Sequence, residues 1–178
     1  VYYLLEEYAK QYDIRISYIQ STDLEGFEAA LQDNTKAIFA ESVGNPVSDV
    51  SPIKHLVSLA NTHKVPFILD NTVPTVALLD AKSLGVDVVW YSLSKSMGGV
   101  GAAIGGAVID TGLFDWKGYQ VEAIAEQAKQ FGQFAFLNRL RFLRSQRGAC
   151  LSPYEAFFIG FNLQLFITIS PLISLFSF

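Results

Sequence analysis

The chain of 178 residues is long enough for about one domain, and 51% of its residues are hydrophobic, so it can bury a sizeable core. A net charge of −4 offers no basic surface for nucleic acid, and we expect no nucleic-acid partner. The single cysteine, Cys150, excludes an internal disulfide framework and is compatible with a reducing compartment. Nothing near Val1 resembles a signal peptide, and we therefore expect a cytoplasmic protein.

Helical and strand-like patterns alternate through the first 110 residues. Short β-branched runs predict strands, and apolar residues at helical spacing predict helices. Such alternation predicts an α/β fold with a mostly parallel sheet covered by helices on both faces. The predicted helices are 1–12, 23–31, 52–63 and 75–84, and the predicted strands are 14–19, 36–41, 67–72, 86–90 and 104–110.

The pattern changes in the last third of the chain. Residues 122–144 predict one long helix or two, and residues 154–178 are strongly apolar, with Glu155 as the one formal charge. The apolar run is about long enough to span a bilayer. Gln164 and Pro171 argue against a membrane span, which we treat as the less favoured alternative.

A lysine follows the apolar run 86–90, in the stretch Tyr91-Ser92-Leu93-Ser94-Lys95-Ser96-Met97-Gly98-Gly99. Ligands of α/β sheets usually bind outside the carboxyl ends of the strands, where Lys95 is expected. A partly desolvated lysine can form a Schiff base with a carbonyl cofactor such as pyridoxal phosphate. Ser92 and Ser94 are candidate hydrogen-bond donors to a phosphate, although a lysine in an exposed loop is the simpler interpretation of Lys95 alone.

An acid ends the preceding strand. Asp70 lies 95 − 70 = 25 residues before Lys95, the span of one helix and one strand in a right-handed crossover. Both side chains are then expected at the same edge of the sheet. Pyridoxal phosphate needs this pair, a lysine for its aldehyde and a carboxylate for its pyridinium nitrogen.

With Asp70-Asn71-Thr72, Ser92-Leu93-Ser94-Lys95 and Gly98-Gly99, the chain resembles the Cys/Met-metabolism branch of the fold-type I pyridoxal-phosphate enzymes. The resemblance runs from near residue 1 to about residue 165. It implies the large domain of a fold-type I transferase and the start of a C-terminal domain. We accordingly expect an incomplete cofactor-binding core over residues 1–115, a helical connection over 116–165, and an apolar tail over 166–178 that does not resemble the family.

The resemblance also implies roles for single residues. Lys95 is expected to be catalytic, and Asp70, Ser92, Ser94, Asn45 and Thr72 are expected to bind pyridoxal 5′-phosphate together with it. Asn45 precedes Pro46, and the alternative interpretation is that it is a turn residue without a role in binding. Ser152, in Gly148-Ala149-Cys150-Leu151-Ser152-Pro153, is expected near the carboxylate of an amino-acid substrate. No metal site is expected.

The activity implied is most like that of O-acetylhomoserine sulfhydrylases, which replace the γ-substituent with sulfide or a thiol. A cystathionine or methionine lyase of the same family is one alternative. Family members are homo-oligomers, dimers or tetramers, and they carry a Tyr-Gly-Gly-Thr loop, an active-site tyrosine and a substrate-binding arginine that these 178 residues do not contain. A second alternative is therefore an inactive truncated fragment that binds at most the cofactor or a homologous subunit.

Overall fold

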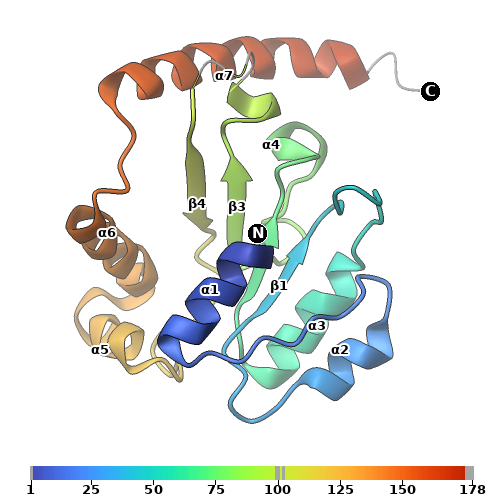
Figure 1. Ribbon diagram of the computed structural model, residues 1–178, viewed down its shortest axis with the longest axis vertical. Coiled ribbons are helices and arrows are strands. Elements are labelled where there is room, and N and C mark those ends of the chain that lie inside the picture. The colour runs from blue at the N-terminus through green and yellow to red at the C-terminus, as the bar shows by residue number, and fades with distance from the viewer. Residues whose placement is uncertain (1, 99–100, 102, 175–178) are drawn as a thin grey trace.

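The structure is a computed structural model that describes residues 2–98, 101 and 103–174, with residues 169–174 described by their backbone alone. A four-stranded sheet lies at its centre, with helices around it (Figure 1). The strands are β1 (Ile38–Glu41), β2 (Phe67–Asp70), β3 (Val88–Ser92) and β4 (Gly106–Asp110). The helices are α1 (Tyr2–Tyr12), α2 (Leu24–Ala30), α3 (Ile53–His63), α4 (Thr75–Leu78), α5 (Glu122–Phe131), α6 (Ala135–Arg147) and α7 (Pro153–Ser174), with short 3₁₀ helices η1 (Ser96–Gly98) and η2 (Gly132–Phe134).

The strand order is β1-β2-β3-β4, with β1, β2 and β3 parallel and β4 antiparallel to β3. The mostly parallel sheet is therefore confirmed, with one antiparallel strand at its edge. The chain reverses direction between Ser92 and Gly106, so β4 pairs with the strand that directly precedes it, whereas the connections between the parallel strands contain α3 and α4.

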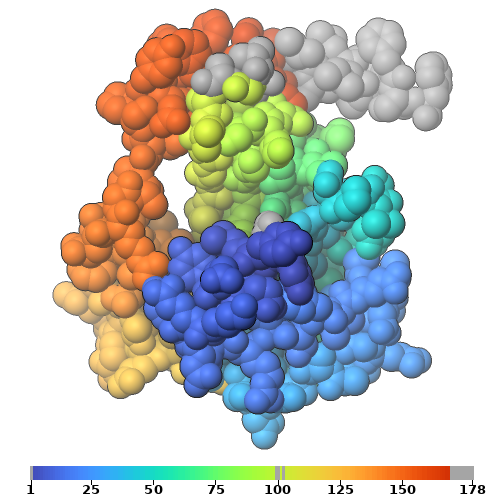
Figure 2. Space-filling model, in the orientation of Figure 1, coloured from blue at the N-terminus to red at the C-terminus, as the bar shows by residue number. Residues whose placement is uncertain are grey.

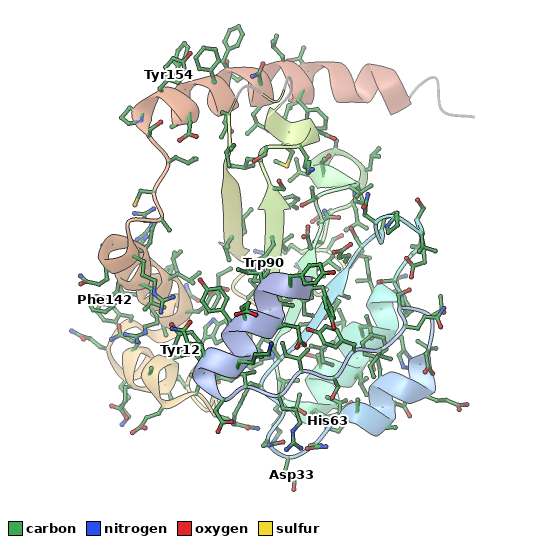
Figure 3. The ribbon with its side chains drawn as sticks, viewed as in Figure 1. Tyr12, Asp33, His63, Trp90, Phe142 and Tyr154 are labelled. Atoms are coloured by element: carbon green, nitrogen blue, oxygen red, sulfur yellow. The ribbon has the colours of Figure 1, made fainter. Side chains whose placement is uncertain are left out.

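Successive side chains of a strand point to opposite faces of the sheet, and each face packs against its own core. One face carries Phe67 and Leu69, which pack with Leu56 of α3 in the larger core. The other face carries Val88, which packs with Trp116 and with α5 and α6 in a second core. Half-buried Trp90 contacts Phe39 on this second face, at a ring separation of 5.1 Å, and Figure 3 labels it near the middle of the sheet.

Two predicted elements are wrong. Residues 14–19 have the alternation of a strand, but they form no ladder and are mostly exposed, since no neighbouring strand offers them backbone partners. The helix predicted over 75–84 stops at Leu78, because the buried side chain of Asn71 donates to the carbonyl oxygens of Thr75 and Leu79 and holds a tight turn there. The remaining predicted helices and strands form, with bounds shifted by a few residues and with 122–144 divided into α5 and α6.

Helix α7 crosses the end of the sheet toward which β3 runs (Figure 1). Its inner side packs the partly buried Leu163 and Phe166 against the larger core, and Ile159, which is 5% exposed, lies against Gly98 and Gly105. Its outer side carries exposed aromatic residues, and Tyr154 points away from the sheet (Figure 3). Helix α7 is continuous across the predicted boundary between residues 165 and 166. Among the described residues, none of the helices combines the length and the apolar character needed to cross a bilayer.

Candidate functional site

The predicted pairing of the acid strand with the lysine strand is confirmed. β2 and β3 are neighbours in parallel register, with Ile68 opposite Val88 and Asp70 opposite Trp90. Asp70 is the last residue of β2, and the loop that carries Lys95 begins where β3 ends. Acid and lysine therefore follow the carboxyl ends of adjacent strands, the usual place for a ligand of an α/β sheet.

Asp70 accepts hydrogen bonds at one carboxylate oxygen and at its backbone carbonyl. Its Oδ1 accepts hydrogen bonds from the N–H of Thr72 at 3.0 Å and from the Thr72 hydroxyl at 2.5 Å. Its backbone carbonyl accepts the N–H of Ser42 at 2.9 Å and the Ser42 hydroxyl at 3.1 Å. The Thr72 oxygen in turn accepts the N–H of Ser92 at 2.8 Å. Three predicted site residues, Asp70, Thr72 and Ser92, thus form one hydrogen-bonded group.

Lys95 lies in the turn between β3 and η1. Its side chain is exposed, and among the described residues it has no hydrogen bond or ion pair. The described residues therefore do not desolvate Lys95, whereas Met97 and Gly98 in the same loop are buried. A Cβ on Gly98 would lie 1.9 Å from the Leu93 carbonyl oxygen, so glycine is needed for this tight turn. Gly99, the second glycine of the pair, lies outside the described residues.

Ser94 fixes the lysine loop to the strand that follows it. Its hydroxyl accepts the N–H of Gly105 at 2.9 Å and donates to the Gly105 carbonyl at 3.2 Å. A Cβ on Gly105 would lie 2.8 Å from side-chain atoms of Ile159 and Leu151, so the backbone there passes close to α7. Gly105 and Ile159 are not among the predicted site residues, although a glycine inside a predicted strand, as Gly105 is within 104–110, is a signal for close backbone approach.

Asn45 and Ser152 stand apart from this group. Asn45 lies exposed in the loop after β1, where its N–H donates to the Glu41 carboxylate at 3.3 Å. Ser152 precedes α7; its hydroxyl accepts the Glu155 N–H at 3.1 Å, and its own N–H donates to the Glu155 carboxylate at 3.3 Å. This reciprocal pair is a capping box. The hydrogen bonds from Ser152 lower the pKa of the Glu155 carboxyl.

The residues at this edge fit pyridoxal phosphate. Lys95 offers an amine without a competing partner among the described residues, and Asp70 offers a positioned carboxylate. Ser92 and Ser94, which precede Lys95 in the chain, are half-buried residues with hydroxyl groups. No hydrogen bond among the described residues engages Oδ2 of Asp70, so one carboxylate oxygen is available to a ring nitrogen. Figure 2 shows the yellow-green segment around residue 95 beside orange α7 and above the blue N-terminal segment.

The chain is similar in sequence to known proteins. The model of the family described as "Cys/Met metabolism PLP-dependent enzyme" matches residues 1–163. An O-acetyl-L-homoserine sulfhydrylase from Corynebacterium glutamicum is 44% identical over 104 residues, which are 58% of this chain and 24% of that protein.

Two solved structures resemble the fold. An O-acetylhomoserine (thiol)-lyase from Campylobacter jejuni, crystallised with N′-pyridoxyl-lysine-5′-monophosphate, has a TM-score of 0.80 and 30% identity over 93% of this chain and 42% of its own. An O-acetylhomoserine sulfhydrylase from Wolinella succinogenes has a TM-score of 0.81 and 28% identity over 94% of this chain and 46% of its own. The present chain thus spans less than half the length of each of these three proteins.

Proposed function

The chain belongs to the Cys/Met metabolism PLP-dependent enzyme family, and on that premise we propose that it forms the lysine-bearing part of a γ-replacement enzyme. The proposed substrate is O-acetylhomoserine, whose γ-substituent is exchanged for sulfide or a thiol to give homocysteine or methionine. The observation that carries the proposal is the pairing of β2 with β3, which brings Asp70 and the Lys95 loop to one edge of the sheet. The lyase alternative is not favoured, because the compared relative and both solved structures have O-acetylhomoserine in their names.

The proposed binding roles follow from the chemistry of each group. Lys95 Nζ holds the aldehyde carbon of pyridoxal phosphate, and Asp70 accepts a hydrogen bond from its ring nitrogen. The hydroxyls of Ser92 and Ser94 are assigned to the phosphate, and Ser94 also fixes the loop through Gly105. Bound pyridoxal phosphate supplies an electron sink for a carbanion at the substrate α-carbon.

Lys95 also has a proposed role in proton transfer. With the substrate bound, the free amine of Lys95 would take the proton from the substrate α-carbon as general base and would move a proton at the β-carbon as general base and acid. Removal of these protons would prepare loss of the acetate from the γ-carbon. After the thiol has added there, the same amine would return protons to the β- and α-carbons. Asn45 and Thr72 stay assigned to the cofactor and Ser152 to the substrate carboxylate. The whole enzyme is proposed to be a homo-oligomer in the cytoplasm.

The test is a visible absorption spectrum of the purified chain with pyridoxal phosphate, beside Lys95→Ala and the control Lys129→Ala. Lys129 is also an exposed lysine, but it lies on α5. We expect a protein-bound band in the unsubstituted chain and in Lys129→Ala, and its complete loss in Lys95→Ala. Borohydride reduction followed by peptide mass spectrometry then places the pyridoxyl group on Lys95.

Two further outcomes separate the alternatives. A band together with homocysteine formation from O-acetylhomoserine and sulfide supports the full activity. A Lys95-dependent band without product supports the alternative of a fragment that holds the cofactor only. A folded chain with no such band contradicts the proposal.

A further inference from the structure

The end of β2 leaves one backbone donor of β3 without a backbone acceptor. The ladder between the two strands continues as far as the N–H of Asn71, which donates to the Trp90 carbonyl at 2.9 Å. The β2 chain then turns away, because the fully buried side chain of Asn71 donates into the α4 turn. The next donor of β3 on this side, the N–H of Ser92, therefore meets the Thr72 hydroxyl instead, at 2.8 Å.

The direction of the Thr72 hydroxyl proton follows from this contact. A backbone N–H is a donor only, so the Thr72 oxygen accepts from Ser92 and its single proton is free for another acceptor. That acceptor is Oδ1 of Asp70, at 2.5 Å, which also receives the Thr72 N–H at 3.0 Å. Oδ1 is thus occupied by two donors, while no hydrogen bond among the described residues engages Oδ2.

We propose that Thr72 is a positioning residue that holds Oδ1 of Asp70 and thereby turns Oδ2 toward the ring nitrogen of the bound cofactor. This inference rests on the proposed function, because it assigns the cofactor ring to Asp70. It gives Thr72 a role through the carboxylate, distinct from a direct contact with the cofactor. The end of β3 also takes part in positioning Asp70, since the Ser92 N–H orients the Thr72 hydroxyl, which donates to Asp70.

The first measurement needs no cofactor. Thr72→Val keeps the shape of the side chain and removes the hydroxyl, whereas Thr72→Ser keeps the hydroxyl. We expect the amide hydrogen of Ser92 to exchange on the order of tenfold faster in Thr72→Val and at the original rate in Thr72→Ser. An unchanged Ser92 rate in a folded Thr72→Val chain would overturn the proposed arrangement.

The second measurement uses two ligands, pyridoxal phosphate and its 1-deaza analogue, in which a C–H replaces the ring nitrogen. Thr72→Val should weaken binding of pyridoxal phosphate about tenfold and leave binding of the analogue unchanged, because only the former has a nitrogen for Asp70. Thr72→Ser should restore the preference for the nitrogen ring. In the Asp70→Asn background, Thr72→Val should have no further effect on this preference. Thr72→Ala provides the same comparison if the valine variant does not fold.

The outcomes separate this role from the proposed function. If the unsubstituted chain binds neither ligand through Lys95, both the proposed function and the role of Thr72 are overturned. If it binds both through Lys95 and Thr72→Val keeps the full preference for the nitrogen ring, only the role of Thr72 is overturned. An equal loss for the two ligands also overturns it, because the effect then does not pass through the ring nitrogen.

Discussion

The two ends of strand β3 both lie beside carboxylates, but the carboxylates are held in different ways. At the carboxyl end, Asp70 is half-buried, accepts the Thr72 hydroxyl and keeps one oxygen clear of protein donors among the described residues. At the opposite end, Asp87 is 4% exposed, and its Oδ2 accepts the buried N–H of Phe67 at 2.9 Å. Asp110 lies opposite Val88, the residue after Asp87, and accepts the indole N–H of Trp116 at 3.0 Å.

The perturbed pKa values lie at the end of β3 opposite the proposed site. Burial raises the pKa of Asp87 to about 6, and the charge of Asp110 acts in the same direction. Burial also raises the pKa of Asp110. Perturbed pKa values often mark functional sites, but these two acids lie beside a packed aromatic core and opposite the edge that carries Lys95. Asp110 is half-buried and lines a surface cavity, so a perturbed pKa indicates function only where the neighbouring groups also have suitable chemistry.

The largest expected effect comes from removing the aromatic core at the acid end. Trp116 is 1% exposed and stacks on Phe136 at a ring separation of 4.7 Å. Trp116→Ala should lower the free energy of unfolding by about 3–5 kcal/mol, measured by urea denaturation. Where the variant is still folded, its Lys95-dependent cofactor band should be unchanged. Trp116→Phe is the control, because it keeps an aromatic ring but loses the hydrogen bond to Asp110, and it should lower the free energy of unfolding by less. Loss of the band in a folded Trp116→Ala chain would show that the two ends are coupled.

The pH dependence of stability gives the next effect. The pKa of Asp87 is raised from 3.8 to about 6 on folding, so the folded chain binds this proton more tightly than the unfolded chain. The resulting stabilisation is complete below about pH 4 and is lost as the pH rises through about 6. Asp87→Asn keeps an oxygen for the Phe67 N–H but cannot titrate, and it should remove about 2 kcal/mol of this fall. The part of the pH-dependent loss of unfolding free energy that comes from Asp110 should remain in this variant.

The matched control for this pH measurement is Asp33→Asn, because Asp33 is exposed at the surface (Figure 3). Its unfolding free energy, followed by urea denaturation between pH 4 and pH 7, should keep the profile of the unsubstituted chain. A profile of Asp87→Asn that equals the original would mean that the buried acid does not control the pH dependence.

Much of the carboxyl edge could be predicted from the sequence, because the information there is local. The 25-residue separation of Asp70 and Lys95 fits one crossover, and the structure pairs their strands as expected. The contacts that position the acid were not predictable. The Ser92 donor reaches Thr72 only because β2 ends two residues earlier, and that end depends on the buried contacts of Asn71 with later parts of the chain.

The incorrect strand prediction and the unpredicted contact of Asp87 have the same physical origin. Residues 14–19 have strand periodicity, but a strand also needs a neighbour, and periodicity carries no information about that neighbour. Asp87 interrupts an apolar run in the sequence, and nothing local indicates that the N–H of Phe67, 20 residues away, is its partner. Tertiary contacts decide both cases.

A smaller effect is expected from Ser94 at the carboxyl edge. Ser94→Ala removes the hydroxyl that bonds to both backbone groups of Gly105 and should lower the free energy of unfolding by about 1 kcal/mol. It should also reduce the preference of the chain for pyridoxal phosphate over pyridoxal, measured by titration with each ligand. Ser145→Ala on α6 removes an exposed hydroxyl and should leave this preference intact. An unchanged preference in Ser94→Ala would limit Ser94 to holding the loop.

The smallest effect is expected where α7 begins. Ser152→Ala removes the capping hydroxyl and should lower the free energy of unfolding by about 0.5–1 kcal/mol, while Ser152→Asp, also a good N-cap residue, should restore it. Neither change should alter the cofactor band, because among the described residues the Ser152 side chain bonds only to Glu155, outside the hydrogen-bonded group of Asp70.

Binding of O-acetylhomoserine to the cofactor-loaded chain, followed by the spectral change it causes, then separates the two roles of Ser152. A loss of binding in Ser152→Ala that Ser152→Asp does not restore indicates contact with the substrate carboxylate, because a second carboxylate repels it. Recovery in Ser152→Asp indicates that Ser152 acts only as the cap of the helix that packs over the lysine loop.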